Sequence, residues 1–268
     1  MRIFLIRHGE SEANLDHGIN KIIPDHDIPL SMLGMEQAQE AGRFLNKFFK
    51  DHPAEEFVQN VLADNIFGTI MSMAGQQGKD IIKMKKDMSK IRLWNSPYKR
   101  ARETASVIGG LINEHVKDTR EDVLLCEQQF GLFDGMNDNE QRENFPIENA
   151  CFMKQKGANG KFWARYPMGE SAFDVSCRLR QFNGTLNRDD DEGIRDHIIV
   201  CHGSVSRLFV MTWLHYKYEW FEEERNPGNC SIRLIDNAGQ SGYVDKGYIF
   251  GGWKEGSKWK PQTNSFTK

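Results

Sequence analysis

The chain has 268 residues, of which 27% are charged, and its formal net charge is −3. A chain of this length can bury a large core as one α/β domain, or as one domain with a substantial insertion. The charge balance offers no basic excess that would favour nucleic acid or an anionic membrane as the main partner. No apolar run approaches the roughly 20 residues that a membrane span requires.

The N-terminus and the cysteines predict a cytoplasmic, reducing compartment. The apolar run at residues 3–6 begins almost at Met1 and leaves no room for a signal peptide ahead of it. The five cysteines are an odd number without a CxxC spacing. We therefore interpret them as reduced thiols, not as a disulfide framework or a zinc site.

Short apolar runs alternate with stretches of helical periodicity along the chain. The runs predict strands at residues 3–6, 91–94, 123–126, 198–201 and 231–235. The periodic stretches predict helices after Ser31 and at residues 101–112, 172–186 and 205–212. This order favours a three-layer α/β fold, with a mostly parallel sheet and helices on both faces.

Two regions interrupt the alternation. Residues 51–90 are far longer than the ordinary connection of about 2–6 residues. We interpret them as a surface insertion, with a lid or an oligomer contact as the alternative. We expect residues 1–240 to form a single domain containing this insertion, and residues 241–268 to form an irregular C-terminal tail. The sequence leaves the oligomeric state open, a homo-oligomer included.

Reactive side chains follow several predicted strands. Arg7 and His8 follow the first strand, Arg100 lies just beyond the second, Glu127 ends the third, and His202 follows the strand at 198–201. Because ligands bind at the carboxyl ends of parallel strands, we expect these side chains to converge at one edge of the sheet.

This set of residue types suits phosphoryl transfer. A neutral imidazole can attack phosphorus and hold the phosphoryl group covalently, and guanidinium groups match the phosphoryl oxygens with bidentate hydrogen bonds. The start of a helix after Gly203 would add backbone donors. Glu127 could protonate the leaving group and then activate water. We expect no metal and no cofactor, because the arginines neutralise the charge.

A series of motifs in chain order resembles the histidine phosphatase (phosphoglycerate mutase-like) superfamily. The motifs are Arg7-His8-Gly9-Glu10-Ser11 through Asn14, Leu30-Ser31 through Gly34, Ser96-Pro97-Tyr98-Lys99-Arg100-Ala101 with Thr104, Cys126-Glu127, Gly169-Glu170-Ser171 and His202-Gly203. They run from residue 2 to about 235, so only the predicted insertion and the tail fall outside the resemblance.

The resemblance implies a role for each candidate residue. His8 would be the phosphorylated nucleophile, and His202 the second histidine of the pocket. Arg7, Arg100 and Asn14 would bind the phosphoryl oxygens together with the Gly203 amide. Glu127 would be the proton donor.

The family contains mutases and phosphatases, and we favour a phosphatase of small phosphomonoesters. Phosphoglycerate mutases carry an adjacent arginine pair downstream of the general acid, whereas this chain has Gln128-Gln129-Phe130-Gly131 there. The pattern looks most like plant and fungal phosphoglycerate mutase-like proteins described as broad-range acid phosphatases. A mutase, or a low-activity family member acting as a scaffold, is the alternative.

Each candidate residue also has a structural alternative. Either histidine could be a satisfied strand-end residue, and Arg7 could pair with a nearby glutamate. Arg100 could face solvent on its helix, Glu127 could be a rim charge, and Asn14 could be a turn residue. We interpret the loop residues His17, His26, Asp16, Asp25 and Asp27 as solvated charge, because their spacing matches no known metal site.

Overall fold

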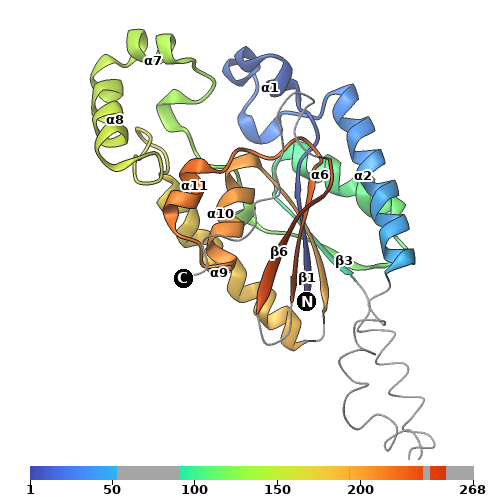
Figure 1. The fold of residues 1–268 in the computed structure, drawn as a ribbon. Helices are drawn as coiled ribbons and strands as arrows, with labels where there is room; N and C mark the ends of the chain where they lie inside the picture. Colours follow the sequence, from blue (N-terminus) through green and yellow to red (C-terminus); the bar gives the residue numbers. More distant parts are fainter. Residues whose placement is uncertain (53–90, 193, 238–241, 252–268) are drawn as a thin grey trace, which may run out of the picture.

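The computed structural model describes residues 1–52, 91–192, 194–237 and 242–251. Within these residues, six strands form one sheet in the order β3-β2-β4-β1-β5-β6 (Figure 1). The strands are β1 (Arg2–Arg7), β2 (Ile91–Asn95), β3 (Val116–Glu121), β4 (Asp196–Cys201), β5 (Ile232–Asn237) and β6 (Tyr243–Phe250). The pairs β2–β3, β2–β4 and β1–β4 are parallel, and β5 is antiparallel to both of its neighbours.

The α-helices of the described residues are α1 (Glu12–Leu15), α2 (Met32–Asp51), α6 (Lys99–Leu111), α7 (Asp138–Asn144), α8 (Pro146–Asn159), α9 (Ala172–Asp191), α10 (Gly203–Trp213) and α11 (Tyr218–Glu223). Short 3-10 turns connect them: η1 (His17–Lys21), η2 (Asp25–Asp27), η3 (Val123–Leu125) and η4 (Gly131–Phe133). The helices predicted after Ser31 and at 101–112, 172–186 and 205–212 are thereby confirmed, as α2, α6, α9 and α10.

The two faces of the sheet bury separate clusters, as the pleat of β1 requires. Ile3 and Leu5 pack with residues of α9 and α10 on one face. Phe4 and Ile6 pack with residues of α2 and α6 on the other face. Figure 1 shows these helix pairs on opposite sides of the strands. The predicted three-layer α/β fold with a mostly parallel sheet is confirmed.

Local sequence explains where the long helices begin. Ser31 is the N-cap of α2, and its hydroxyl oxygen accepts a hydrogen bond from the Gly34 N–H at 3.0 Å. In α2 the helically spaced Ala38, Ala41 and Leu45 are fully buried, which makes one face of the helix a core surface. Ser171 caps α9 through a capping box with Asp174.

Two predictions about the secondary structure are wrong. Residues 123–126 are not a strand: they contain the turn η3, and the strand beside β2 is β3, at Val116–Glu121. The tail expected to be irregular from residue 241 contains β6, which pairs with β5 along the edge of the sheet. The predicted insertion at 51–90 lies almost wholly outside the described residues.

No helix in the described ranges is long and apolar enough to cross a membrane. The cytoplasmic location stays a prediction.

The strands direct the chain toward one end of the sheet. Figure 1 shows the segment around α1 and the lobe formed by α7 and α8 at the end of the sheet opposite the N-terminus. Because β1 starts at Arg2 near that terminus, its carboxyl end leads toward these two segments.

Candidate active site

The loop that carries His8 follows β1 and is fixed to two neighbouring elements. The His8 N–H donates to the Cys201 carbonyl of β4 at 2.9 Å. The Gly9 N–H donates to Thr104 Oγ1 of α6 at 3.0 Å. His8 follows β1, Ser96 follows β2 and His202 follows β4, so these residues lie at the carboxyl ends of neighbouring parallel strands.

The same loop touches the start of α2 backbone to backbone. The Ser31 N–H donates to the Glu10 carbonyl, and Ser31 Oγ donates to Glu10 Oε1, both at 2.9 Å. A Cβ atom on Gly9 would lie 2.5 Å from the Gly34 carbonyl oxygen, and one on Gly34 would lie 2.0 Å from the Glu10 carbonyl oxygen. Both positions therefore exclude a side chain, which explains the glycines of the first two motifs.

His8 is buried, and its hydrogen bond selects one tautomer. Its Nδ1 lies 2.7 Å from the Gly9 carbonyl oxygen. A carbonyl can only accept, so Nδ1 carries the proton and Nε2 of the neutral ring bears the lone pair. Burial, with the charges of Arg100 and Arg7, lowers the pKa of His8 well below 6.5. The imidazole is thus held in its neutral form, with the lone pair on Nε2.

His202 lies beside His8, with the two ring centroids 5.1 Å apart. Its Nε2 is 2.8 Å from Ser96 Oγ, and its buried Nδ1 has no hydrogen-bond partner among the described residues. Burial, followed by the charge of Arg100, lowers the pKa of His202 well below 6.5. His202 is the N-cap of α10, so Gly203 is the first residue of that helix.

Arg7 and Arg100 are both secured by other groups of the protein. Arg7 Nη1 donates to the Pro227 carbonyl at 2.7 Å, while its buried Nε finds no hydrogen-bond partner in the part of the chain that the structure describes. Arg100 is buried, not solvent-facing, and it binds Asp25. Its Nη1 donates to Asp25 Oδ1 at 2.8 Å and to the Asp25 carbonyl at 2.6 Å, and its Nη2 donates to Oδ2 at 3.2 Å.

Glu127 is half-buried at the pocket and lies on a supported segment. Its Oε1 accepts the Gln128 N–H at 2.9 Å. Arg178 of α9 donates to the Cys126 and Glu127 carbonyls at 2.7 and 3.2 Å, and pairs with Glu170 at 3.1 Å. The general-acid candidate thus follows η3 and not a strand end, and α9 holds its backbone in place.

Asn14 combines a structural contact with a place at the pocket. Its Oδ1 accepts from the Ser11 N–H at 3.0 Å, closing a capping box on α1, and from Asn229 Nδ2 at 3.3 Å. These bonds occupy the amide oxygen and use none of the hydrogens of Asn14 Nδ2.

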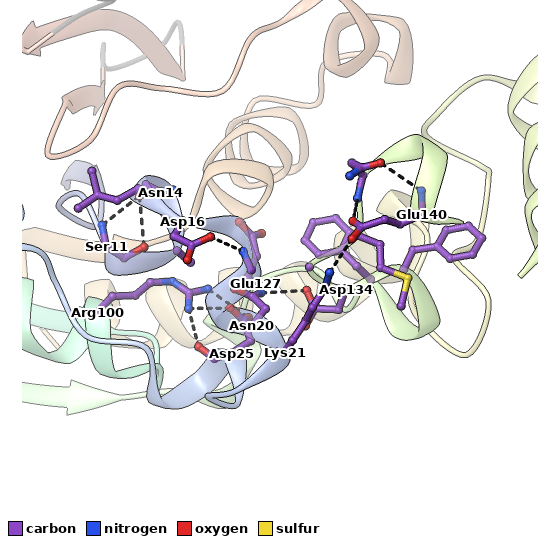
Figure 2. Close-up of a pocket in the computed structure, with 18 of the residues that line it drawn as sticks. Ser11, Asn14, Asp16, Asn20, Lys21, Asp25, Arg100, Glu127, Asp134 and Glu140 are labelled. Carbon is purple, nitrogen blue, oxygen red and sulfur yellow. Dashed lines mark hydrogen bonds and ion pairs between the residues drawn. The ribbon is translucent and has the colours of Figure 1, made fainter. Parts of the chain in front are cut away.

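A single pocket of about 820 Å³ collects most of the predicted residues. Arg7, His8, Asn14, Arg100 and Glu127 line it, while His202 and Gly203 are not among its lining residues. Much of the remaining wall comes from η1 on one side and, on the other, from the segment that runs from η4 into α7. Figure 2 shows these two walls joined by Lys21 with Glu140, at 2.6 Å, and by Asn20 with Asp134, at 3.3 Å.

Sequence reasoning missed three residues that contact the site. Asp25 was assigned to solvated loop charge, yet its carboxylate pairs with Arg100 and its side chain is only 24% exposed. Ser96 was named within a motif but received no role, and Arg178 was not considered. Each acts through a contact across at least 51 residues of chain, which no local pattern reveals.

Comparisons with known proteins agree with this fold. The profile of the histidine phosphatase superfamily (branch 1) matches residues 3–53 and 76–247. The chain belongs to this superfamily. Its relatives include the phosphoglycerate mutase-like protein AT74 of Arabidopsis thaliana, which is 33% identical over 253 residues covering 90% of this chain and 66% of that protein.

A second relative is the broad-range acid phosphatase DET1 of Saccharomyces cerevisiae. It is 29% identical over 290 residues covering 87% of this chain and 84% of that protein. The crystal structure of the α-ribazole phosphatase from Shigella flexneri matches with a TM-score of 0.62 and 20% identity, covering 92% of this chain and 96% of that one. That last likeness shows the fold alone. Family membership and the phosphatase relatives support a phosphatase enzyme.

Proposed function

We propose that the chain hydrolyses small phosphomonoesters through a covalent phosphohistidine on His8. The observation that carries the proposal is the bond from His8 Nδ1 to the Gly9 carbonyl, which leaves Nε2 unprotonated in a pocket that also contains two arginines. The yeast relative named a broad-range acid phosphatase supports the same class of substrate.

In the first step, Nε2 of His8 attacks phosphorus, and the bond from phosphorus to the alcohol oxygen breaks. Glu127 gives its proton to the departing oxygen. Arg7 and Arg100 bind the non-bridging oxygens, where the charge develops. A phosphoryl oxygen would also give the unpartnered Nδ1 of His202 a hydrogen-bond partner.

In the second step, water attacks the phosphohistidine, and the carboxylate of Glu127 takes the proton of that water. The bond between phosphorus and Nε2 breaks, and inorganic phosphate leaves. His8 returns to its neutral tautomer, and Glu127 regains the proton that it lost in the first step, so the cycle closes without a cofactor.

The lowered pKa of His8 supports activity on the acidic side of neutral. The nucleophile must be neutral and the general acid must be protonated, which are opposite demands that predict a bell-shaped pH profile. Because burial and the two arginines keep His8 neutral well below pH 6.5, the acidic limb of this profile lies at low pH.

The test is phosphate release from p-nitrophenyl phosphate and from a small panel that includes 3-phosphoglycerate. The natural chain is compared with His8→Ala and with His215→Asn as a matched control. His215 is exposed and has a φ of 55°, a conformation that Asn tolerates.

We expect release that vanishes in His8→Ala and persists in His215→Asn, with an acid-labile phosphoenzyme trapped only when His8 is present. Formation of 2-phosphoglycerate at a rate that matches or exceeds phosphate release would instead assign a mutase. The absence of both products from the natural chain would favour a binding role.

A further inference from the structure

The charged residues that line the pocket are mostly acidic. Of the residues that the structure describes, three cations line it, namely Arg7, Lys21 and Arg100, against five carboxylates: Asp16, Asp25, Glu127, Asp134 and Glu140. In the proposed function a phosphoryl dianion takes Arg7 and Arg100. The charged groups that face the alcohol part of the substrate are therefore the lining residues other than these two arginines.

The remaining cation of the lining residues is already paired. Lys21 Nζ lies 2.6 Å from Glu140 Oε1, in an ion pair that links η1 to α7. Arg100 shares its guanidinium with Asp25 at 2.8 Å. The described part of the pocket thus offers no unpaired cation to a second anionic group on the substrate.

Asp134 lies in the part of the pocket wall between η4 and α7. Among the described residues it forms no ion pair, and the amide of Asn20 donates to its Oδ1 at 3.3 Å. Burial raises the pKa of Asp134 above 3.8, and the nearby carboxylate of Asp25 raises it further. A half-buried carboxylate that pays for desolvation without a cation attracts a hydroxyl or ammonium group and repels an anion.

Aromatic rings complete this side of the pocket. Phe130 and Tyr166 both line it and meet edge to face, with their ring centroids 5.1 Å apart. Such rings pack against the carbon atoms of an alcohol and favour a cation over an anion at their faces. The rings and Asp134 therefore both favour a neutral or cationic group over an anionic one.

We propose that this pocket selects phosphomonoesters whose alcohol part is neutral or cationic, that it rejects those with a second anionic group, and that Asp134 is the specificity-determining residue. The proposal rests on the proposed phosphatase function and names its substrate class. It requires only that the alcohol part of a bound substrate extend past Glu127 toward η4, where the pocket continues.

The test uses three substrates of similar size. Glycerol 3-phosphate has a neutral alcohol part, O-phosphoethanolamine a cationic one, and 3-phosphoglycerate an anionic one. We expect kcat/KM for 3-phosphoglycerate to be lower than for the other two by about tenfold, because its carboxylate would be repelled by a like charge a few ångströms away. The natural chain alone supplies this result.

The variant Asp134→Asn assigns the effect. It preserves shape and removes one charge, and we expect it to raise the ratio of kcat/KM for 3-phosphoglycerate to kcat/KM for glycerol 3-phosphate about fivefold or more. The matched control is Glu219→Gln, which removes a charge from the exposed surface of α11, away from the pocket lining. This control should leave the ratio of the two kcat/KM values unchanged.

The outcomes separate this inference from the proposed function. Equal or preferred hydrolysis of 3-phosphoglycerate, still dependent on His8, would overturn the charge selectivity and leave the phosphatase standing. A tenfold selectivity that survives Asp134→Asn unchanged would overturn the role of Asp134. If the natural chain hydrolysed none of the three substrates, the proposed function itself would fail.

Discussion

The contact between Gly34 and the loop that carries His8 makes a strong prediction for Gly34→Ala. The new Cβ would lie 2.0 Å from the Glu10 carbonyl oxygen and 2.9 Å from both the Glu10 nitrogen and carbonyl carbon. These neighbours are backbone atoms, so no side-chain rotation relieves the clash. The loop and the start of α2 must separate by about 1 Å, since overpacked sites relax by shifts of the backbone.

The separation should lower both stability and activity. Overpacking of this kind costs about 1–3 kcal/mol of unfolding free energy. A displacement of about 1 Å in a catalytic group costs about 100-fold in rate, and the displaced segment here follows His8 directly. We therefore expect Gly34→Ala to lose about two orders of magnitude in kcat/KM at a temperature where it is still folded.

The assays are urea denaturation and phosphate release from p-nitrophenyl phosphate. Gly110→Ala in α6 is the matched control, because a Cβ there meets no atom within 4 Å. It should stabilise the helix slightly, by up to about 1 kcal/mol, and leave kcat/KM unchanged. A Gly34→Ala protein as stable and as active as the natural chain would refute the argument from close backbone contact.

Three further predictions follow from the buried charges. Arg100→Gln removes a positive charge that lowers the pKa of His8, so that pKa should rise and the acidic limb of the kcat/KM profile should move to higher pH; a limb that stays or moves to lower pH contradicts this. Glu127→Gln should reduce kcat/KM, which reports the first step, by about 10²- to 10⁴-fold on glycerol 3-phosphate, but much less on p-nitrophenyl phosphate, whose leaving group needs little protonation; equal losses in kcat/KM would argue against Glu127 as the proton donor. Arg92→Met leaves the buried carboxylate of Asp189 without its arginine partner and removes the bond to Asp118 at 2.7 Å. The free energy of unfolding measured in urea should therefore fall by about 3–5 kcal/mol, and a fall of less than about 1 kcal/mol would refute the reasoning.

The sequence predicted the central strands and main helices because their apolar spacing is set by burial on both faces of the sheet. Every residue of β4 is buried, so Ile198 to Cys201 form an uninterrupted apolar run. The edge strands carry a weaker signal. In β3 only Val116 and Asp118 are half-buried. The other residues of this strand are exposed, and most of their side chains are charged.

The misassigned third strand shows how an apolar cluster can mislead. Leu125 is fully buried, yet Val123 is 70% exposed, as befits a short turn that inserts one side chain into the core. The strand β6 was missed because it is a strand without a clear apolar pattern. It includes Lys246 and Gly247, the latter with a φ of 77°, and its register with β5 is irregular, so period-two alternation is obscured.

The candidate site was predictable to the extent that it depends on strand ends. Arg7, His8 and His202 lie where a parallel sheet must place the residues that end or follow β1 and β4, so strand prediction located them. Glu127 was found through its motif, although the strand assigned to it is wrong. The roles of all these residues remain predictions, and the variants His8→Ala and Glu127→Gln test two of them.

The partner of Arg100 could not be predicted, and it changes how that arginine can act. Asp25 occupies both Nη1 hydrogens and one Nη2 hydrogen, through its carbonyl and both carboxylate oxygens. In a planar guanidinium the hydrogens left over are those of Nε and the second Nη2 hydrogen, which share one edge. A carboxylate that looks like a competitor for phosphate therefore fixes the plane of the guanidinium and leaves one bidentate edge for a phosphoryl group. The contact joins residues 75 apart in sequence, so only the folded chain reveals it.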